Sequence, residues 1–157
     1  MIRGRMDRIV NVLDQIDRAI IEQLQRDGRV PYTRLGAAVG LSEAAARHRV
    51  QRLIDAGVMQ VVAVTNPLSI GYRRMAMIGV RTEGPSDEIA DALQSMPDID
   101  YLVVTAGSFD LMCEVVVGDD SDLLDLTNRI RRVPGVVSTE TFIYLDLVKQ
   151  TFTWGAH

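Results

Sequence analysis

The stretch from Leu35 to Leu53, which reads L-G-A-A-V-G-L-S-E-A-A-A-R-H-R-V-Q-R-L, constrains the fold more than any other part of the chain. It predicts two short helices joined by a tight turn, the helix-turn-helix pattern. Gly40 can take the positive φ at which the first helix ends. Ser42 is a strong N-cap for the second, because its hydroxyl can accept a backbone N–H that has no partner within the helix. Apolar residues then recur on one face at helical spacing: Ala46, Val50, Leu53 and Ile54.

The opposite face of this second helix carries small residues first and hydrogen-bonding side chains after them: Glu43, Ala44, Arg47, His48 and Gln51. That order suits a helix whose N-terminal half enters the major groove of DNA. For an isolated helix, a polar face that is simply solvated is the commoner explanation. The helices before it and the charge distribution favour the DNA-reading interpretation.

Two further helices are expected before the turn. Asp14 can cap the first, with Asp17 completing an arrangement like a capping box, and Asp27-Gly28 ends it. Pro31 is tolerated in a first helical turn and opens the second helix, which runs to Val39. With the helix from Ser42 to Ala56, residues 1–57 form a three-helix DNA-binding domain.

The charges of the chain are divided unevenly. Residues 1–60 hold ten arginines against seven acidic residues, whereas residues 61–157 hold seven basic residues against fourteen acidic ones. An arginine-bearing module joined to an acidic remainder fits a DNA reader attached to a part that stays off DNA.

Several classes of protein are disfavoured by composition. Cys113 is the only cysteine, so no disulfide framework exists, and we expect a buried structural thiol and a cytoplasmic protein. No apolar run is long enough to span a membrane, and the basic start Met1–Val10 is expected to be a tail rather than a signal peptide. Because His48 and His157 are the only histidines, a metal site and a histidine-based catalytic centre are disfavoured. We also predict no cofactor.

After Gly57 the apolar pattern changes its period. Residues Val58–Thr65 are β-branched and predict a strand, which Asn66-Pro67 ends. A three-helix module offers this strand no partner. We therefore interpret residues 58–67 as a linker strand that pairs with something outside its own module.

The remainder, residues 68–157, contains an internal repeat at an offset of 37, in which Met96-Pro97-Asp98-Ile99 aligns with Val133-Pro134-Gly135-Val136. Each copy reads strand, helix, turn, strand. This predicts an α+β domain of β-α-β-β-α-β plan, an antiparallel sheet with both helices on one face. The expected strands are Arg74–Thr82, Ile99–Thr105, Leu111–Val117 and Val136–Val148, and the expected helices Ser86–Met96 and Asp119–Val133.

The sheet face away from the helices keeps apolar candidates, namely Met75, Met77, Val104 and Tyr144. An uncovered apolar face usually indicates a partner, so we expect at least a homodimer. The hairpin that joins the two copies is Ala106, Gly107, Ser108, Phe109 and Asp110. A glycine there can expose successive backbone N–H groups to a carboxylate, and an aspartate can accept an ammonium. A turn that merely connects two strands is the alternative.

In their order and spacing, these residues resemble the Lrp/AsnC family, the feast/famine regulators of bacteria and archaea. The resemblance covers nearly the whole chain. It is carried by Leu13-Asp14, Asp17, Leu24-Gln25, Asp27-Gly28-Arg29, Leu35, Val39-Gly40-Leu41-Ser42, Arg49-Val50, Arg52-Leu53, Gly57-Val58, Asn66-Pro67, Gly107, Phe109-Asp110, Pro134-Gly135-Val136 and Val148-Lys149.

The resemblance implies a winged helix-turn-helix followed by a ferredoxin-like ligand-sensing domain. It also implies a dimer, commonly assembled into octamers, with a small molecule, usually an amino acid, bound near the Ala106–Asp110 hairpin. Family members often carry an apolar residue at Arg47 and arginine at His48 and Gln51, so the operator sequence does not follow. Ser108 stands where well-known members carry Asp, so the effector does not follow either.

We therefore predict a transcriptional regulator that binds double-stranded DNA and a small-molecule effector, with no enzymatic activity. Arg49 and Arg52 flank the buried Val50 and Leu53, so they hold either phosphates or an acid within the domain. One alternative is an enzyme on the same scaffold, like the sirohaem decarboxylases, which the acidic C-terminal part disfavours. The other is a stand-alone amino-acid sensor, which the arginines of the Ser42 helix disfavour.

Overall fold

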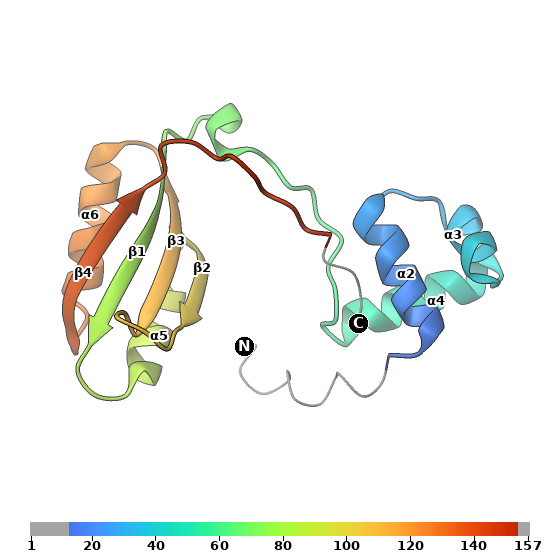
Figure 1. The fold of residues 1–157 in the computed structure, drawn as a ribbon, viewed down its shortest axis with the longest axis horizontal. Helices are drawn as coiled ribbons and strands as arrows, with labels where there is room; N and C mark the ends of the chain where they lie inside the picture. Colours follow the sequence, from blue (N-terminus) through green and yellow to red (C-terminus); the bar gives the residue numbers. More distant parts are fainter. Residues whose placement is uncertain (1–12, 154–157) are drawn as a thin grey trace. The chain divides into compact units, whose positions relative to one another are not determined.

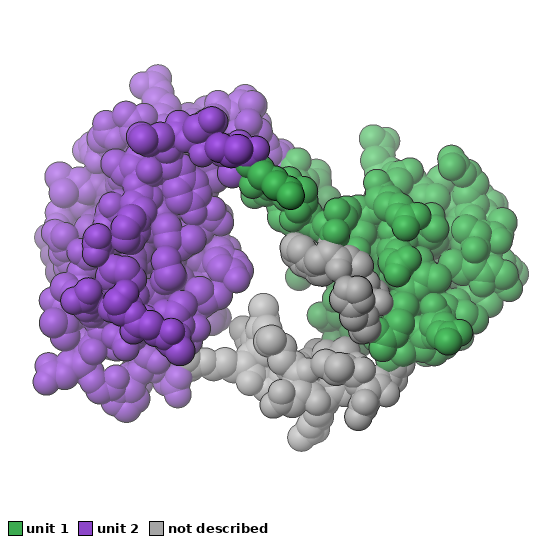
Figure 2. Space-filling model, in the orientation of Figure 1, with its two compact units in different colours: residues 1–64, 149–157 green, residues 65–148 purple. Residues whose placement is uncertain are grey.

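The computed structural model describes residues 13–153, shown in Figure 1. These residues form two compact units (Figure 2): residues 13–64 with 149–153, and residues 65–148. The basic N-terminal stretch expected to be a tail, Met1–Val10, lies outside the described residues. None of the helices within the described part of the chain is long and apolar enough to cross a membrane.

Three helices make up the first unit: α2 (Gln15–Arg26), α3 (Tyr32–Val39) and α4 (Glu43–Asp55). A capping box begins α2, in which the Asp14 carboxylate accepts the backbone N–H of Asp17 at 2.7 Å and the Asp17 carboxylate accepts that of Asp14. Apolar side chains from all three helices form one core, as the spacing predicted: Ile20, Ile21, Leu35, Ala46, Val50 and Leu53.

The turn between α3 and α4 follows the sequence prediction. Gly40 ends α3 in the left-handed region at φ 72°, and the Ser42 hydroxyl accepts the backbone N–H of Ala45 at 3.2 Å. Gly36 has a role that periodicity did not indicate. A Cβ at this position would lie 2.7 Å from the carbonyl oxygen of Leu41, so only glycine lets the turn pack this closely on α3.

The strand predicted at Val58–Thr65 is not formed in the single chain, and the described part of the first unit contains no strand at all. Val58 donates its N–H to the carbonyl of Leu53, and the residues after it run without regular structure. Val62 and Val64 are 66% and 61% exposed. A strand needs a hydrogen-bonded neighbour, and a three-helix unit supplies none.

The second unit has the predicted β-α-β-β-α-β order. After a short 3₁₀ helix, η1 (Pro67–Ile70), come β1 (Arg74–Thr82), α5 (Ser86–Gln94), β2 (Ile99–Val104), β3 (Leu111–Val117), α6 (Asp120–Arg131) and β4 (Val136–Ile143). The four strands pair antiparallel in the order β2-β3-β1-β4. Both helices cover the same face of the sheet (Figure 1), as the repeat predicted.

The last strand is shorter than expected. β4 ends at Ile143, which pairs with Ala76, and the Tyr144 N–H then donates to Met75. Beyond this point β4 would run past the start of β1 and lose its partner. Accordingly Leu145 is 97% and Val148 88% exposed.

The register assigns each strand residue to one face of the sheet. The covered face packs on the helices through Ile78, Leu111, Cys113 and other buried residues. Met77, Glu114 and Phe142 are cross-strand neighbours on the open face. Val104 pairs with the buried Leu111 and so lies at the edge of the covered side. Our prediction that Val104 belongs to the open face was therefore wrong.

Candidate nucleic-acid interface and effector site

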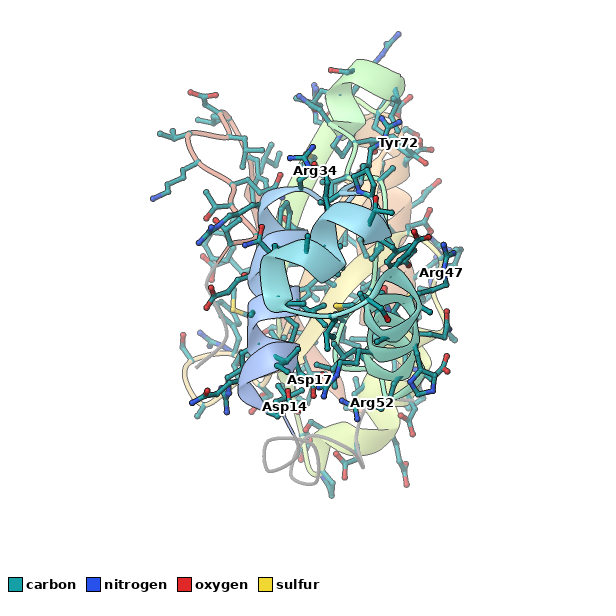
Figure 3. The ribbon with its side chains drawn as sticks, turned by 90° about the vertical axis from the view of Figure 1, so that its right-hand side faces the viewer. Asp14, Asp17, Arg34, Arg47, Arg52 and Tyr72 are labelled. Atoms are coloured by element: carbon teal, nitrogen blue, oxygen red, sulfur yellow. The ribbon has the colours of Figure 1, made fainter. Side chains whose placement is uncertain are left out.

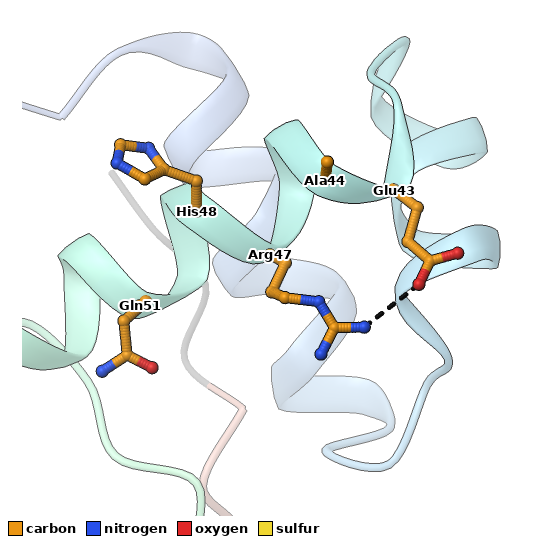
Figure 4. Close-up of a pocket in the computed structure, with 5 residues that line it drawn as sticks. All are labelled: Glu43, Ala44, Arg47, His48 and Gln51. Atoms are coloured by element: carbon orange, nitrogen blue, oxygen red, sulfur yellow. Dashed lines mark hydrogen bonds and ion pairs between the residues drawn. The ribbon is translucent and has the colours of Figure 1, made fainter.

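Five exposed side chains line a pocket on one face of α4: Glu43, Ala44, Arg47, His48 and Gln51. All five were predicted from the sequence, and the close-up in Figure 4 shows them along the same side of the helix. Their spacing of three and four residues places them one above the other, while the buried residues of α4 face the core. The second helix of the motif thus presents both small and hydrogen-bonding groups to solvent.

Arg47 is held on two sides. Its Nη2 donates to Glu43 Oε1 at 3.0 Å, the ion pair drawn in Figure 4. Its guanidinium carbon also lies 4.6 Å from the centre of the Tyr32 ring, at the start of α3. Further along the same face, Gln51 Nε2 donates to Asp55 at 2.8 Å. Tyr32 thus contacts this exposed face of α4 through Arg47, although nothing in the sequence singled it out.

Arg49 and Arg52 point to the other side of α4, toward α2. Arg49 Nη1 lies 2.6 Å from Asp14 Oδ2 and 2.9 Å from Asp17 Oδ1, and Arg52 Nη2 lies 2.6 Å from Asp17 Oδ2. Figure 3 shows Asp14, Asp17 and Arg52 gathered at one end of the unit. Two roles were left open for these arginines, contact with phosphates or with an acid of the same domain. The structure shows the second, because both pair with aspartates of α2 and its N-cap.

The side-chain hydrogen bond from Arg49 lowers the pKa of the Asp14 carboxyl below its ordinary value of 3.8. A carboxyl whose pKa is depressed by folding stabilises the folded state above its unfolded pKa. That contribution is lost as the pH falls through the folded pKa, which here lies below 3.8.

The hairpin between β2 and β3 brings together the five residues predicted for the effector. Ala106, Gly107 and Ser108 are exposed, and within residues 13–153 their N–H groups donate no hydrogen bond. Asp110 is more deeply engaged than expected. One carboxylate oxygen accepts the backbone N–H of Thr82 at 2.7 Å, and the Asp110 N–H donates to Val80 at 3.0 Å. Asp110 therefore attaches the hairpin to β1 through one carboxylate oxygen and its own N–H group, and the other carboxylate oxygen is not needed for this role.

Phe109 folds back over the open face of the sheet. Its ring lies over Gly79, where a Cβ would come within 2.7 Å of the ring atoms. It also makes an edge-to-face contact with Phe142, with 6.1 Å between the ring centres. The guanidinium carbon of Arg81 lies 5.3 Å from the centre of the Phe109 ring. Arg81 Nε donates to the Ser108 carbonyl at 2.9 Å. A glycine in the middle of a strand was the only sequence signal for this approach.

Two titratable groups of the second unit, Cys113 and Tyr144, are shielded from solvent by burial. Burial raises the pKa of the Cys113 thiol to about 11, which agrees with the structural thiol predicted. Burial also raises the pKa of Tyr144 to about 12, and a hydrogen bond to Glu114 acts in the same direction. Tyr144 thus lies on the open face beside Glu114, as predicted.

Comparison with known proteins agrees with both units. Residues 13–54 match the AsnC-type helix-turn-helix domain, and residues 75–154 match the Lrp/AsnC ligand binding domain. The HTH-type transcriptional regulator FL11 of Pyrococcus furiosus is 33% identical over 142 residues, which cover 89% of this chain and 94% of that protein.

Solved structures share the fold. The Leucine response regulatory protein LrpA of Mycobacterium tuberculosis superposes with a TM-score of 0.80 at 32% identity, covering 88% of this chain and 96% of that one. An L-Met complex of a Neisseria meningitidis transcriptional regulator gives a TM-score of 0.77 at 24% identity, covering 90% and 95%, a likeness of fold.

The helix-turn-helix unit and the ligand-binding sheet together define a class of protein, the DNA-binding transcriptional regulators that respond to a small-molecule effector. Within that class, the chain belongs to the Lrp/AsnC family.

Proposed function

We propose that this regulator reads double-stranded DNA through the exposed face of α4, with Glu43, Ala44, Arg47, His48 and Gln51 at the base edges. The observation that carries the proposal is that five solvent-facing side chains share one face of the second helix of the motif. Major-groove recognition needs such a face, because a helix inserted there reaches base edges with three or four side chains.

Arg49 and Arg52 act in this proposal by fixing α4 on α2, since both donate to the Asp17 carboxylate. Half of the Arg52 side chain is exposed, so it can still reach a phosphate while it remains in this ion pair. Ser42 contributes by capping α4. Regulation proceeds by binding alone, without an enzymatic step and in the cytoplasm.

The proposed effector is an amino acid, and the proposed site is the hairpin Ala106–Asp110. The free N–H groups of Ala106, Gly107 and Ser108 suit a carboxylate, and the second oxygen of Asp110 suits an ammonium. The name of the Mycobacterium tuberculosis relative, a leucine response protein, makes leucine the first amino acid to test.

The proposed assembly is a homodimer formed through the open face of the sheet. Tyr101 and Phe142 are large side chains on that face, 56% and 43% exposed in the single chain. Covering them removes apolar surface from water. Further association of dimers into octamers follows from the resemblance to the family. A dimer places two α4 helices on half-sites about 34 Å apart along the DNA or a multiple of that spacing.

Fluorescence anisotropy of a labelled duplex, titrated with the full chain at several salt concentrations, tests the proposal. The duplex is selected from a randomised pool by the protein itself. We expect two chains per site and an affinity that falls on the order of 10³-fold from 50 to 200 mM salt, because phosphate contacts release counterions. No selection of any sequence, or an affinity independent of salt, would contradict DNA reading, and one chain per duplex would contradict the dimer.

A further inference from the structure

Tyr32 contacts Arg47 from outside α4. Arg47 is the central side chain of the proposed reading face, which consists of Glu43, Ala44, Arg47, His48 and Gln51. Tyr32 is the first residue of α3, its side chain is half-buried, and it packs against the core of the helical unit. The guanidinium carbon of Arg47 lies 4.6 Å from the centre of the ring. The ring of Tyr32 is thus held by packing against the core, and the Arg47 guanidinium above it belongs to the proposed interface.

The same guanidinium is restrained at a second point. Glu43, one helical turn before Arg47, accepts a hydrogen bond from Nη2 at 3.0 Å. The Arg47 and Glu43 side chains are 61% and 46% exposed, so the ion pair alone is open to water and weak. A planar guanidinium that both stacks on a ring and donates to a carboxylate has far fewer rotamers than a free arginine.

Restraint matters at this position because of how arginine reads a base. The guanidinium recognises guanine by two parallel hydrogen bonds to O6 and N7, which require a defined plane and direction. A side chain already held in one orientation loses less conformational entropy on binding. By contrast, the sequence-independent attraction to phosphates depends mainly on positive charge, which a lysine or an unrestrained arginine also carries.

We propose that Tyr32 is a specificity-determining positioning residue: its ring holds the guanidinium of Arg47 in the orientation that reads one guanine of the operator. The proposal rests on the proposed DNA-binding function. Because Tyr32 belongs to α3, α3 then contributes to base discrimination. Tyr32 itself touches no base in this account and acts only through Arg47.

The test uses the full chain and a duplex that the wild-type protein selects from a randomised pool. Each base pair of that duplex is then replaced in turn and the affinity of every variant is measured. We expect Tyr32→Leu to reduce discrimination at a single guanine about tenfold while leaving affinity for unrelated duplex unchanged. Tyr32→Phe keeps the ring and loses only the hydroxyl, so it should discriminate like the wild type.

A double-mutant cycle separates this role from general support of the fold. In an Arg47→Ala background, Tyr32→Leu should change discrimination no further, because there is no guanidinium left to orient. Arg47→Lys provides a second route if Tyr32→Leu unfolds the helices. It keeps the charge at an exposed position and loses the planar group, and should lose the same guanine preference.

The results of these experiments separate the positioning role of Tyr32 from the proposed DNA-binding function. If Arg47→Ala alters preference at one base pair but Tyr32→Leu does not, Tyr32 has no positioning role and the DNA-reading function stands. An Arg47→Lys variant with wild-type preference would likewise overturn the positioning role. If the wild-type protein selects no sequence at all, the failure lies with the proposed function.

Discussion

The carboxylate of Asp17 is 1% exposed and accepts hydrogen bonds from three donors on two helices. It receives the backbone N–H of Asp14 at the start of α2 and the guanidinium groups of Arg49 and Arg52 from α4. A buried charge is tolerated only when its oxygens are well satisfied. Asp17 therefore fixes how α4 packs on α2.

Replacing Asp17 by alanine is expected to destabilise the protein by about 3 kcal/mol. The change removes one end of the capping box and leaves two arginines without their buried acceptor. Asp14→Ala is the matched comparison, since this exposed carboxylate also caps α2 and pairs with Arg49. Its loss should cost clearly less, because the carboxylate is exposed and Arg49 keeps Asp17 as a partner. Urea unfolding of both variants measures the difference, and equal losses would contradict the central role of Asp17.

The roles of some single residues could be predicted from the sequence, and those of others could not. Asp14, Asp17, Gly40 and Ser42 were placed correctly because each acts on backbone groups within a few positions. Gly36, Tyr32 and Gly79 were not singled out, because each acts on a residue from another element. Their importance depends on packing distances that no local pattern contains.

At the scale of elements, how well the bounds of a strand were predicted depends on whether the strand has a hydrogen-bonded partner along its whole length. β1 and β3 were bounded correctly, since both lie inside the sheet between two partners. β4 was predicted five residues too long because its apolar run continues past the start of β1. Residues 58–65 have the composition of a strand but no strand partner among residues 13–153. Pairing decides the outcome for such segments.

The hairpin Ala106–Asp110 joins a structural and a proposed binding role, and Asp110→Asn separates them. The amide oxygen of asparagine can still accept the Thr82 N–H, so the fold should be retained. The charge that an ammonium needs is gone, so leucine binding measured by calorimetry should weaken at least tenfold. Asp110→Ala should also destabilise the sheet, by about 1–3 kcal/mol, because the Thr82 N–H loses its acceptor.

Leucine affinity unchanged in Asp110→Asn would exclude the carboxylate as the ammonium acceptor. If the wild-type protein binds neither leucine nor any other amino acid, the hairpin does not bind an amino acid and its role is structural. DNA binding without ligand should be the same in wild type and Asp110→Asn, because the substituted residue belongs to the second unit.

At the scale of the whole molecule, the two units divide the chemistry between them. The first carries an excess of arginine and the exposed face of α4, and the second carries the acidic excess, the hairpin and the open sheet face. Charge counts along the sequence anticipated this division because net charge is a property of composition. An effector that changes DNA affinity must couple the two units, and in the proposed function this coupling acts through the dimer proposed to form at the open sheet face.

The central claim is that the exposed face of α4 reads base pairs. It is tested most directly by comparing Arg47→Ala with Arg132→Ala on the duplex selected by the wild-type protein. Both changes remove one exposed positive charge, the first from the reading face and the second from the end of α6. Affinities for the selected duplex and its single-base variants are measured at one salt concentration.

Arg47→Ala should lose about 1–3 kcal/mol of binding free energy and its preference at one base pair. Arg132→Ala should bind and discriminate like the wild-type protein. An Arg47→Ala variant with wild-type affinity and preference, or an equal loss in both variants, would contradict the account.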